Sequence, residues 1–157
     1  MSTVHPKHFY VTLLSNTSKN LYPDNTITVI ASELARPVEL SFSYNWEVGV
    51  CEFTFPPNSV VTVKHTTVVG DTTGLIYCEL ISTLYVGRAL VRCMRTFIYP
   101  SLSDQHVFDK VYYLPVEKGT FKTIRIEILQ LTGKPVEIKS STTPSNVVLH
   151  FRRLSTS

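Results

Sequence analysis

Alanine and glycine are scarce in this chain, and each shortage excludes a class of protein. Alanine, the strongest helix former, occurs only at positions 31, 35 and 89, which argues against a helical protein. The six glycines among 157 residues form no phosphate-binding loop and no dinucleotide-binding pattern. Charged residues make up 17% of the chain and hydrophobic residues 43%, a combination that excludes a disordered protein.

Long apolar runs are absent as well. No run approaches the roughly 20 residues that a membrane span needs, and the polar residues 1–8 lack the apolar core of a secretory signal. The net charge of +3 is too mild to require a nucleic-acid partner. By its length we expect the chain to form one domain over residues 1–157, with short flexible arms at 1–7 and 154–157.

Cysteine and histidine are few and scattered. Cys51, Cys78 and Cys93 are an odd number without a CxxC pair, so we interpret them as free, mostly buried thiols made in a reducing compartment. The five histidines, at positions 5, 8, 65, 106 and 150, include no pair one residue apart on a strand, as a cupin-type metal site requires. We therefore predict no metal and no cofactor, and expect the histidines to be solvated or half-buried on strands.

What the chain has in abundance is β-branched residues, namely 19 valines, 9 isoleucines and 19 threonines. These side chains favour strands over helices, and turn signals recur about every ten residues. The predicted strands are His8–Leu14, Thr26–Ala31, Pro37–Ser43, Trp46–Phe55, Ser59–Thr67, Leu75–Ile81, His106–Leu114, Thr120–Leu129 and Asn146–Arg153. The segment Val86–Ile98 is ambiguous between a long strand and a short helix. This pattern predicts an all-β protein, an antiparallel β-sandwich or barrel.

Two of these strands indicate the core. Trp46–Phe55 is apolar on both faces, with Trp46 and Val48 on one side and Phe53 on the other, which predicts a central strand. Thr120–Leu129 has the clearest period of two, with three isoleucines facing inward. The predicted core residues are Trp46, Val48, Phe53, Ile124, Ile126 and Ile128.

Two short loops contain catalytic residue types, and neither predicts an enzyme. Asp71–Gly74 has one residue more than the Asp-Thr-Gly loop of aspartic proteases, whose two carboxylates also need a second loop or subunit. Ser103–His106 holds a serine, an aspartate and a histidine. Catalytic triads assemble from separate parts of a fold, however, and this loop has no nucleophile elbow. We expect an ordinary turn and loop.

Arginines are the remaining candidates for function. Arg88, Arg92 and Arg95 lie within eight residues and fit a solvated edge, a protein interface or, less well, a phosphate contact. Arg152 and Arg153 fit either a charge that protects a sheet edge or an interface. We treat all five as candidate protein-interface residues.

Three stretches, taken in order and spacing, resemble a known family. They are FYVTL (9–13) followed by SN (15–16) and YPDNT (22–26); WEVGVCE (46–52) with FP (55–56); and VYYLPV (111–116), FKTIRIEI (121–128), TGKPV (132–136) and VVLHFRR (147–153). Together they resemble the penton, or minor capsid, protein of Polinton/Maverick elements and the related adintoviruses. The likeness covers roughly residues 9–153. It departs at Arg88 and Arg92, near which the family has an acidic residue and a proline, and in residues 60–73.

The resemblance implies a single jelly roll of about eight strands and a structural role without catalysis. It implies a homopentamer at the capsid vertices, in contact with a double jelly-roll major capsid protein, and leaves open a spike or fibre protein above it. The protein would be made inside the host cell and incorporated into the virion. Alternatives are another minor capsid or cement protein, or a ligand-binding or receptor-attachment sandwich using Tyr99, Tyr112 and Tyr113. A nucleoplasmin-like chaperone would need acidic tracts, which this chain lacks.

Overall fold

The computed structural model describes eleven stretches of the chain and is built from antiparallel strands. The described residues are 7–14, 29–40, 44–54, 60–63, 66–67, 72–86, 88–99, 105–117, 119–130, 137–139 and 146–154. Within these stretches there is no helix, and so none long and apolar enough to cross a membrane. The prediction of an all-β protein is therefore confirmed.

The strands follow one another along the whole chain. They are β1 (His8–Leu14), β2 (Val29–Glu39), β3 (Trp46–Thr54), β4 (Val60–Val63), β5 (Thr66–Thr67), β6 (Thr72–Cys78), β7 (Leu84–Val86), β8 (Ala89–Val91), β9 (Cys93–Tyr99), β10 (Gln105–Val107), β11 (Leu114–Pro115), β12 (Thr120–Gln130), β13 (Glu137–Lys139) and β14 (Asn146–Arg153). The bounds predicted for the first and last strands match β1 and β14.

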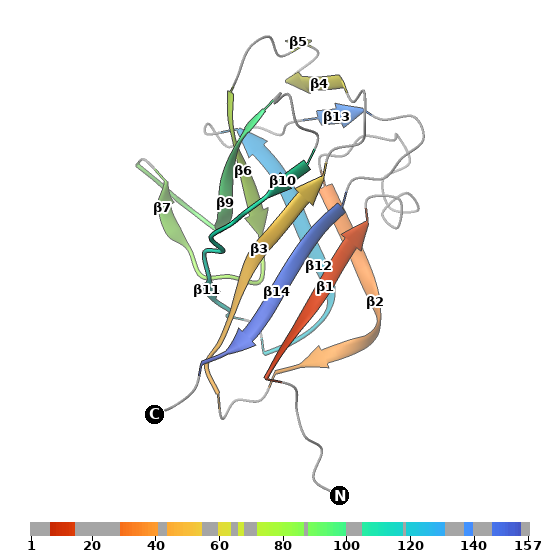
Figure 1. The fold of residues 1–157 in the computed structure, drawn as a ribbon, viewed down its shortest axis with the longest axis vertical. Helices are drawn as coiled ribbons and strands as arrows, with labels where there is room; N and C mark the ends of the chain where they lie inside the picture. Colours follow the sequence, from red (N-terminus) through yellow and green to blue (C-terminus); the bar gives the residue numbers. More distant parts are fainter. Residues whose placement is uncertain are drawn as a thin grey trace, which may run out of the picture.

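Two antiparallel sheets make up most of the molecule and pack as a β-sandwich (Figure 1). One has the order β1-β14-β3-β10, with the short β11 also paired to β3, and the other has the order β2-β12-β6-β9. Strands β4, β5 and β13 form a small separate sheet at one end, and β7 with β8 forms a hairpin. Strand β1 pairs with β14 over its full length, so the two ends of the described chain lie side by side.

The core lies between the two main sheets and is apolar. All six residues predicted for it are buried, from fully buried Val48 and Phe53 to Trp46 at 8% exposure. Inward residues alternate with outward ones along β12 and β14, as expected for strands with one solvated face. Aromatic rings from three strands meet there, because Phe151 stacks on Phe9 at 4.8 Å and on Phe121 at 5.6 Å between ring centroids.

One continuous strand replaces two that the sequence predicted. The expected strands Thr26–Ala31 and Pro37–Ser43 are joined in β2, which runs from Val29 to Glu39. The register against β12 shifts between Phe121 and Thr123, so the extra residues of β2 are absorbed in a bulge. Strand β2 lies at the edge of its sheet, where a proline without an N–H group is tolerated.

A β-bulge in β3 also changes which of its side chains face the core. The sequence predicted that Trp46 and Phe53 face opposite sides, but both belong to the same core. The pairing with β14 skips Cys51, because Val50 lies opposite Leu149 and Glu52 opposite Val148. One extra residue inverts the alternation, so Phe53 returns to the inner face. The central position of β3 in its sheet is confirmed.

Three further expectations are corrected or limited by the structure. The strand predicted over His106–Leu114 is broken into β10 and β11, with residues 108–113 between them outside any strand. The ambiguous segment Val86–Ile98 contains β8 and most of β9, so its helical alternative is wrong.

Most of both predicted arms, Asp71, and Ser103–Asp104 lie outside the described residues. Of the arms, Lys7 accepts a hydrogen bond from the Arg153 N–H, and Leu154 donates one to Asn45.

Candidate functional site

The predicted arginine cluster does not act as one patch, because each member has different surroundings. Arg88 is exposed in the turn of the β7–β8 hairpin. Arg92 donates to the Ile81 carbonyl and pairs with Glu117, and this hydrogen bond to Glu117 raises the arginine pKa. Arg92 thus ties the start of β9 to the residues that follow β11.

Arg95 holds the segment that breaks the predicted strand. We call residues 108–113 the crossing segment. The Arg95 guanidinium lies between two aromatic rings of this segment, with its Cζ 4.3 Å from the Phe108 centroid and 4.0 Å from that of Tyr112. It also donates to the Lys110 carbonyl at 2.7 Å. Two cation–π contacts and a charge-assisted hydrogen bond fix the segment against β9.

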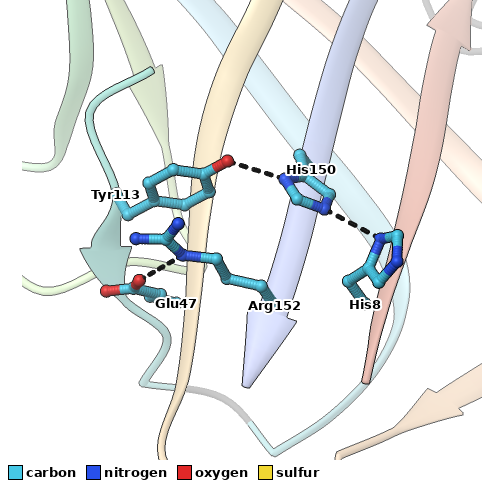
Figure 2. A network of polar contacts seen from close by, with 5 residues as sticks. All are labelled: His8, Glu47, Tyr113, His150 and Arg152. Atoms are coloured by element: carbon cyan, nitrogen blue, oxygen red, sulfur yellow. Dashed lines mark hydrogen bonds and ion pairs between the residues drawn. The ribbon is translucent and has the colours of Figure 1, made fainter. Parts of the chain in front are cut away.

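The crossing segment passes over β3 at Gly49. A Cβ atom on Gly49 would overlap the Val111 side chain and lie 2.7 Å from the Tyr112 carbonyl oxygen. Only a residue without a side chain allows such a close approach of backbone to backbone. Gly49 lies opposite His150 in the sheet, so the crossing points the Tyr113 hydroxyl towards His150 on β14 (Figure 2).

Arg152 and Arg153 both lie against tyrosine rings. The Arg152 Nε donates to Glu47 Oε1 at 2.5 Å across the β3–β14 pair, and its Cζ is 3.4 Å from the Tyr113 centroid. The Arg153 Cζ is 4.1 Å from the Tyr44 centroid. Both arginines are therefore engaged within the chain, while their remaining exposure leaves contact with a partner open.

A polar network on the outer face of β1, β14 and β3 is the most organised group of chemically active side chains in the described structure (Figure 2). The Tyr113 hydroxyl and His150 Nδ1 are 2.7 Å apart, and His150 Nε2 is 3.2 Å from His8 Nδ1. The Tyr10 ring stacks on His150 with centroids 4.4 Å apart, and the His8 ring meets His150 edge-on. Side chains from two elements, β1 and the crossing segment, therefore meet His150 of β14.

The environment of His150 disfavours its charged form. Partial burial lowers the pKa of His150, and its electrostatic interactions with His8 and Arg152 act in the same direction. Burial raises the pKa of Tyr113, so its hydroxyl keeps its proton. The simplest proton arrangement then has Tyr113 donating to His150 Nδ1 and the His150 Nε2–H donating to His8 Nδ1.

Sequence reasoning missed this network because its members are far apart in the chain. It treated the histidines as unrelated, yet His8 and His150 are 142 positions apart and lie on paired strands. The alternation in Asn146–Arg153 does place His150 and Arg152 together on the solvent face. No local pattern indicates that the first and last strands pair. Nor does any local pattern indicate that Tyr113 reaches His150.

A separate pocket of about 360 Å³ lies beside this face. Its lining includes Tyr44, Trp46, Glu47, Glu117 and Leu154. Both carboxylates are already paired with arginines, whereas the buried Trp46 Nε1 has no hydrogen-bond partner in the described structure.

Neither metal-ligand clusters nor disulfides are found in the described stretches. No three histidine, cysteine, aspartate or glutamate side chains come together there. Cys51, Cys78 and Cys93 form no disulfide, and burial raises the pKa of Cys51 and of Cys93.

In comparisons with protein-family models, curated proteins and solved structures, no match to this chain was found.

Proposed function

We propose that this protein is a structural component of an icosahedral virion, the vertex protein (penton) of a Polinton-like or adintovirus-like virus, with a single jelly-roll fold. Under this proposal it assembles as a homopentamer and contacts a double jelly-roll major capsid protein. Such a role requires shape and side surfaces, and needs no catalytic group or cofactor. The protein would be made in the host cell and end in the capsid.

The observation that carries the proposal is the order of the eight strands in the two main sheets. Numbered along the chain as 1 to 8, they are β1, β2, β3, β6, β9, β10, β12 and β14. The first pairs with the eighth, the second with the seventh, the third with the sixth and the fourth with the fifth. An eight-stranded ribbon folded once and then rolled into two sheets has these nested pairs, which is the topology of a jelly roll.

The sequence resemblance supplies the specific role, because jelly rolls occur in lectins and cupins as well as in capsids. Within the described residues, the stretches that carry the likeness lie on β1, β3, β12 and β14 and on the crossing segment with β11; residues 15–16, 22–26, 55–56 and 132–136 lie outside them. Of the two segments that depart from the family, residues 60–73 contain β4 and β5 of the small end sheet and the first two residues of β6, and the other includes Arg88 and Arg92.

The proposal is tested by the solution mass of the purified chain and by co-assembly. Light scattering should detect a species of five times 17.8 kDa, and negative-stain averages should have five-fold symmetry. If the free chain is monomeric, it is co-expressed with the major capsid protein of the same genome, and the vertices of the resulting shells are imaged. A stable dimer or trimer, or shells that leave the chain out of their vertices, would overturn the proposal.

A ligand-binding or receptor-attachment sandwich is a second candidate, and exposed aromatic rings favour it. Tyr10 is 60% exposed and Tyr112 is 52% exposed. One side of Tyr112 is covered by Arg95, and Tyr113 is covered by Arg152, which reduces the flat surface available to a sugar ring. The side chain of Tyr99 lies outside the described part. Binding on a glycan array that is lost on Tyr10→Ala would favour this candidate.

A further inference from the structure

We propose that His8 and His150 form a binding site for a first-row divalent transition metal ion, of the class of Zn²⁺, Ni²⁺ and Cu²⁺. The site lies on the outer face of the β1–β14 pair, where His8 is exposed and His150 is half-buried (Figure 2). The inference rests on these two residues and their neighbours, and does not depend on a capsid role.

The distance between the two facing nitrogens fits a shared metal ion. His150 Nε2 and His8 Nδ1 are 3.2 Å apart. Two nitrogens, each about 2.0–2.1 Å from one zinc ion at a tetrahedral angle, lie about 3.3–3.4 Å apart. The strands already hold the nitrogens at nearly this spacing, so binding requires ring rotations and little backbone movement. The two ring planes are inclined at 84°, with their centroids 5.2 Å apart.

The chemistry of the donors selects the metal class. Neutral imidazole is a good ligand for Zn²⁺, Ni²⁺ and Cu²⁺, whereas Mg²⁺ and Ca²⁺ prefer oxygen. His8 is exposed, so an ion can approach from solvent and water can fill the remaining coordination positions.

Tyr113 and Tyr10 orient the inner histidine. When His150 Nε2 holds the metal, the ring proton moves to Nδ1, and Tyr113 accepts the hydrogen bond that it otherwise donates at 2.7 Å. Tyr10 stacks on the same ring with an interplanar angle of 15° and limits its tilt. A hydrogen bond to the far nitrogen of a metal-binding histidine fixes its tautomer and strengthens binding. Tyr113 is thus a positioning residue for the site.

One neighbouring charge opposes binding and is largely offset. Arg152 lies over the Tyr113 ring, and its charge acts on His150. Glu47 pairs with Arg152 at 2.5 Å, which reduces the net positive charge near the histidines. With two protein ligands and this neighbour, we expect a labile site of modest affinity rather than a permanent structural metal.

The test is isothermal titration of the tag-free chain, because a polyhistidine tag would bind the same ions. We expect one Zn²⁺ or Ni²⁺ per chain and no heat from Mg²⁺. His8→Gln and His150→Gln should each weaken binding at least tenfold. The matched control His106→Gln, a histidine on β10 of the same sheet, should change the affinity less than twofold. Tyr113→Phe should weaken binding about tenfold at unchanged stoichiometry.

An NMR measurement on the unmodified chain tests the site even if a variant fails to fold. Substoichiometric Ni²⁺ should broaden the imidazole NMR signals of His8 and His150 before those of the other histidines. No binding at millimolar Zn²⁺, or binding that survives both His8→Gln and His150→Gln, would overturn the site. Equal broadening of all histidine signals would also overturn it. An affinity unchanged by Tyr113→Phe would remove the positioning role of that residue.

Discussion

Replacing Gly49 by alanine tests whether the crossing segment lies against β3 as described. Strand propensity alone predicts that the change is favourable, since glycine in a strand costs roughly 0.5–1 kcal/mol relative to alanine. The structure predicts the opposite sign. A Cβ atom would overlap the Val111 side chain and approach the Tyr112 carbonyl oxygen to 2.7 Å, and that oxygen belongs to backbone fixed by Arg95 and its aromatic neighbours. The segment would have to lift from the sheet.

The magnitude follows from the cost of overpacking, typically 1–3 kcal/mol. Because the contact is with backbone, we expect the upper part of that range, about 3 kcal/mol of unfolding free energy. In a domain of this size that corresponds to a fall in Tm of about 6–12 °C. Thermal unfolding followed by circular dichroism, together with urea titration, measures both quantities. The same change should weaken the Tyr113–His150 hydrogen bond, because Gly49 lies opposite His150.

The double variant Gly49→Ala with Val111→Ala is the matched control. Shortening Val111 removes its methyl from the overlap but leaves the Tyr112 carbonyl in place. It should therefore recover part of the stability lost in Gly49→Ala, and less than all of it. A Gly49→Ala protein as stable as the parent, or more stable, would refute this description of the crossing.

Three further predictions follow from the described contacts. Phe151→Ala removes a fully buried ring stacked on Phe9 and should cost about 3–5 kcal/mol in urea unfolding; a loss under 1 kcal/mol would contradict the shared core. Arg95→Met removes two cation–π contacts and should speed hydrogen exchange across the crossing segment, with Arg88→Met as an exposed control that leaves it unchanged. Burial raises the pKa of Cys51 and Cys93, so native protein at pH 7.5 should react slowly with a thiol reagent, and protein unfolded in urea should react rapidly. Fast labelling of the native protein would contradict this burial.

The sequence alone was sufficient to predict the class of fold and the parts of the fold that depend on local pattern. Strands β1 and β14 were predicted with their observed bounds, because alternation with a period of two runs through each without interruption. The burial of Ile124, Ile126 and Ile128 follows from the same pattern. Where a bulge interrupts the period, as at Cys51, alternation assigned Phe53 to the wrong face. A single extra residue reverses every later position, and the sequence carries no local mark of it.

Only the tertiary structure decided what lies on the outer face of the β1–β14–β3 sheet. Pairing of the first strand with the last brings His8 to His150, and the crossing at Gly49 brings Tyr113 to His150. Arg92 and Arg95 belong to one basic cluster in the sequence, but they contact separate elements. The reason is that β8 and β9 replace the helix that would have aligned them. Local periodicity is determined by each residue and its neighbours in the chain. The polar network depends on contacts between residues more than a hundred positions apart, and these form only when the sheets assemble.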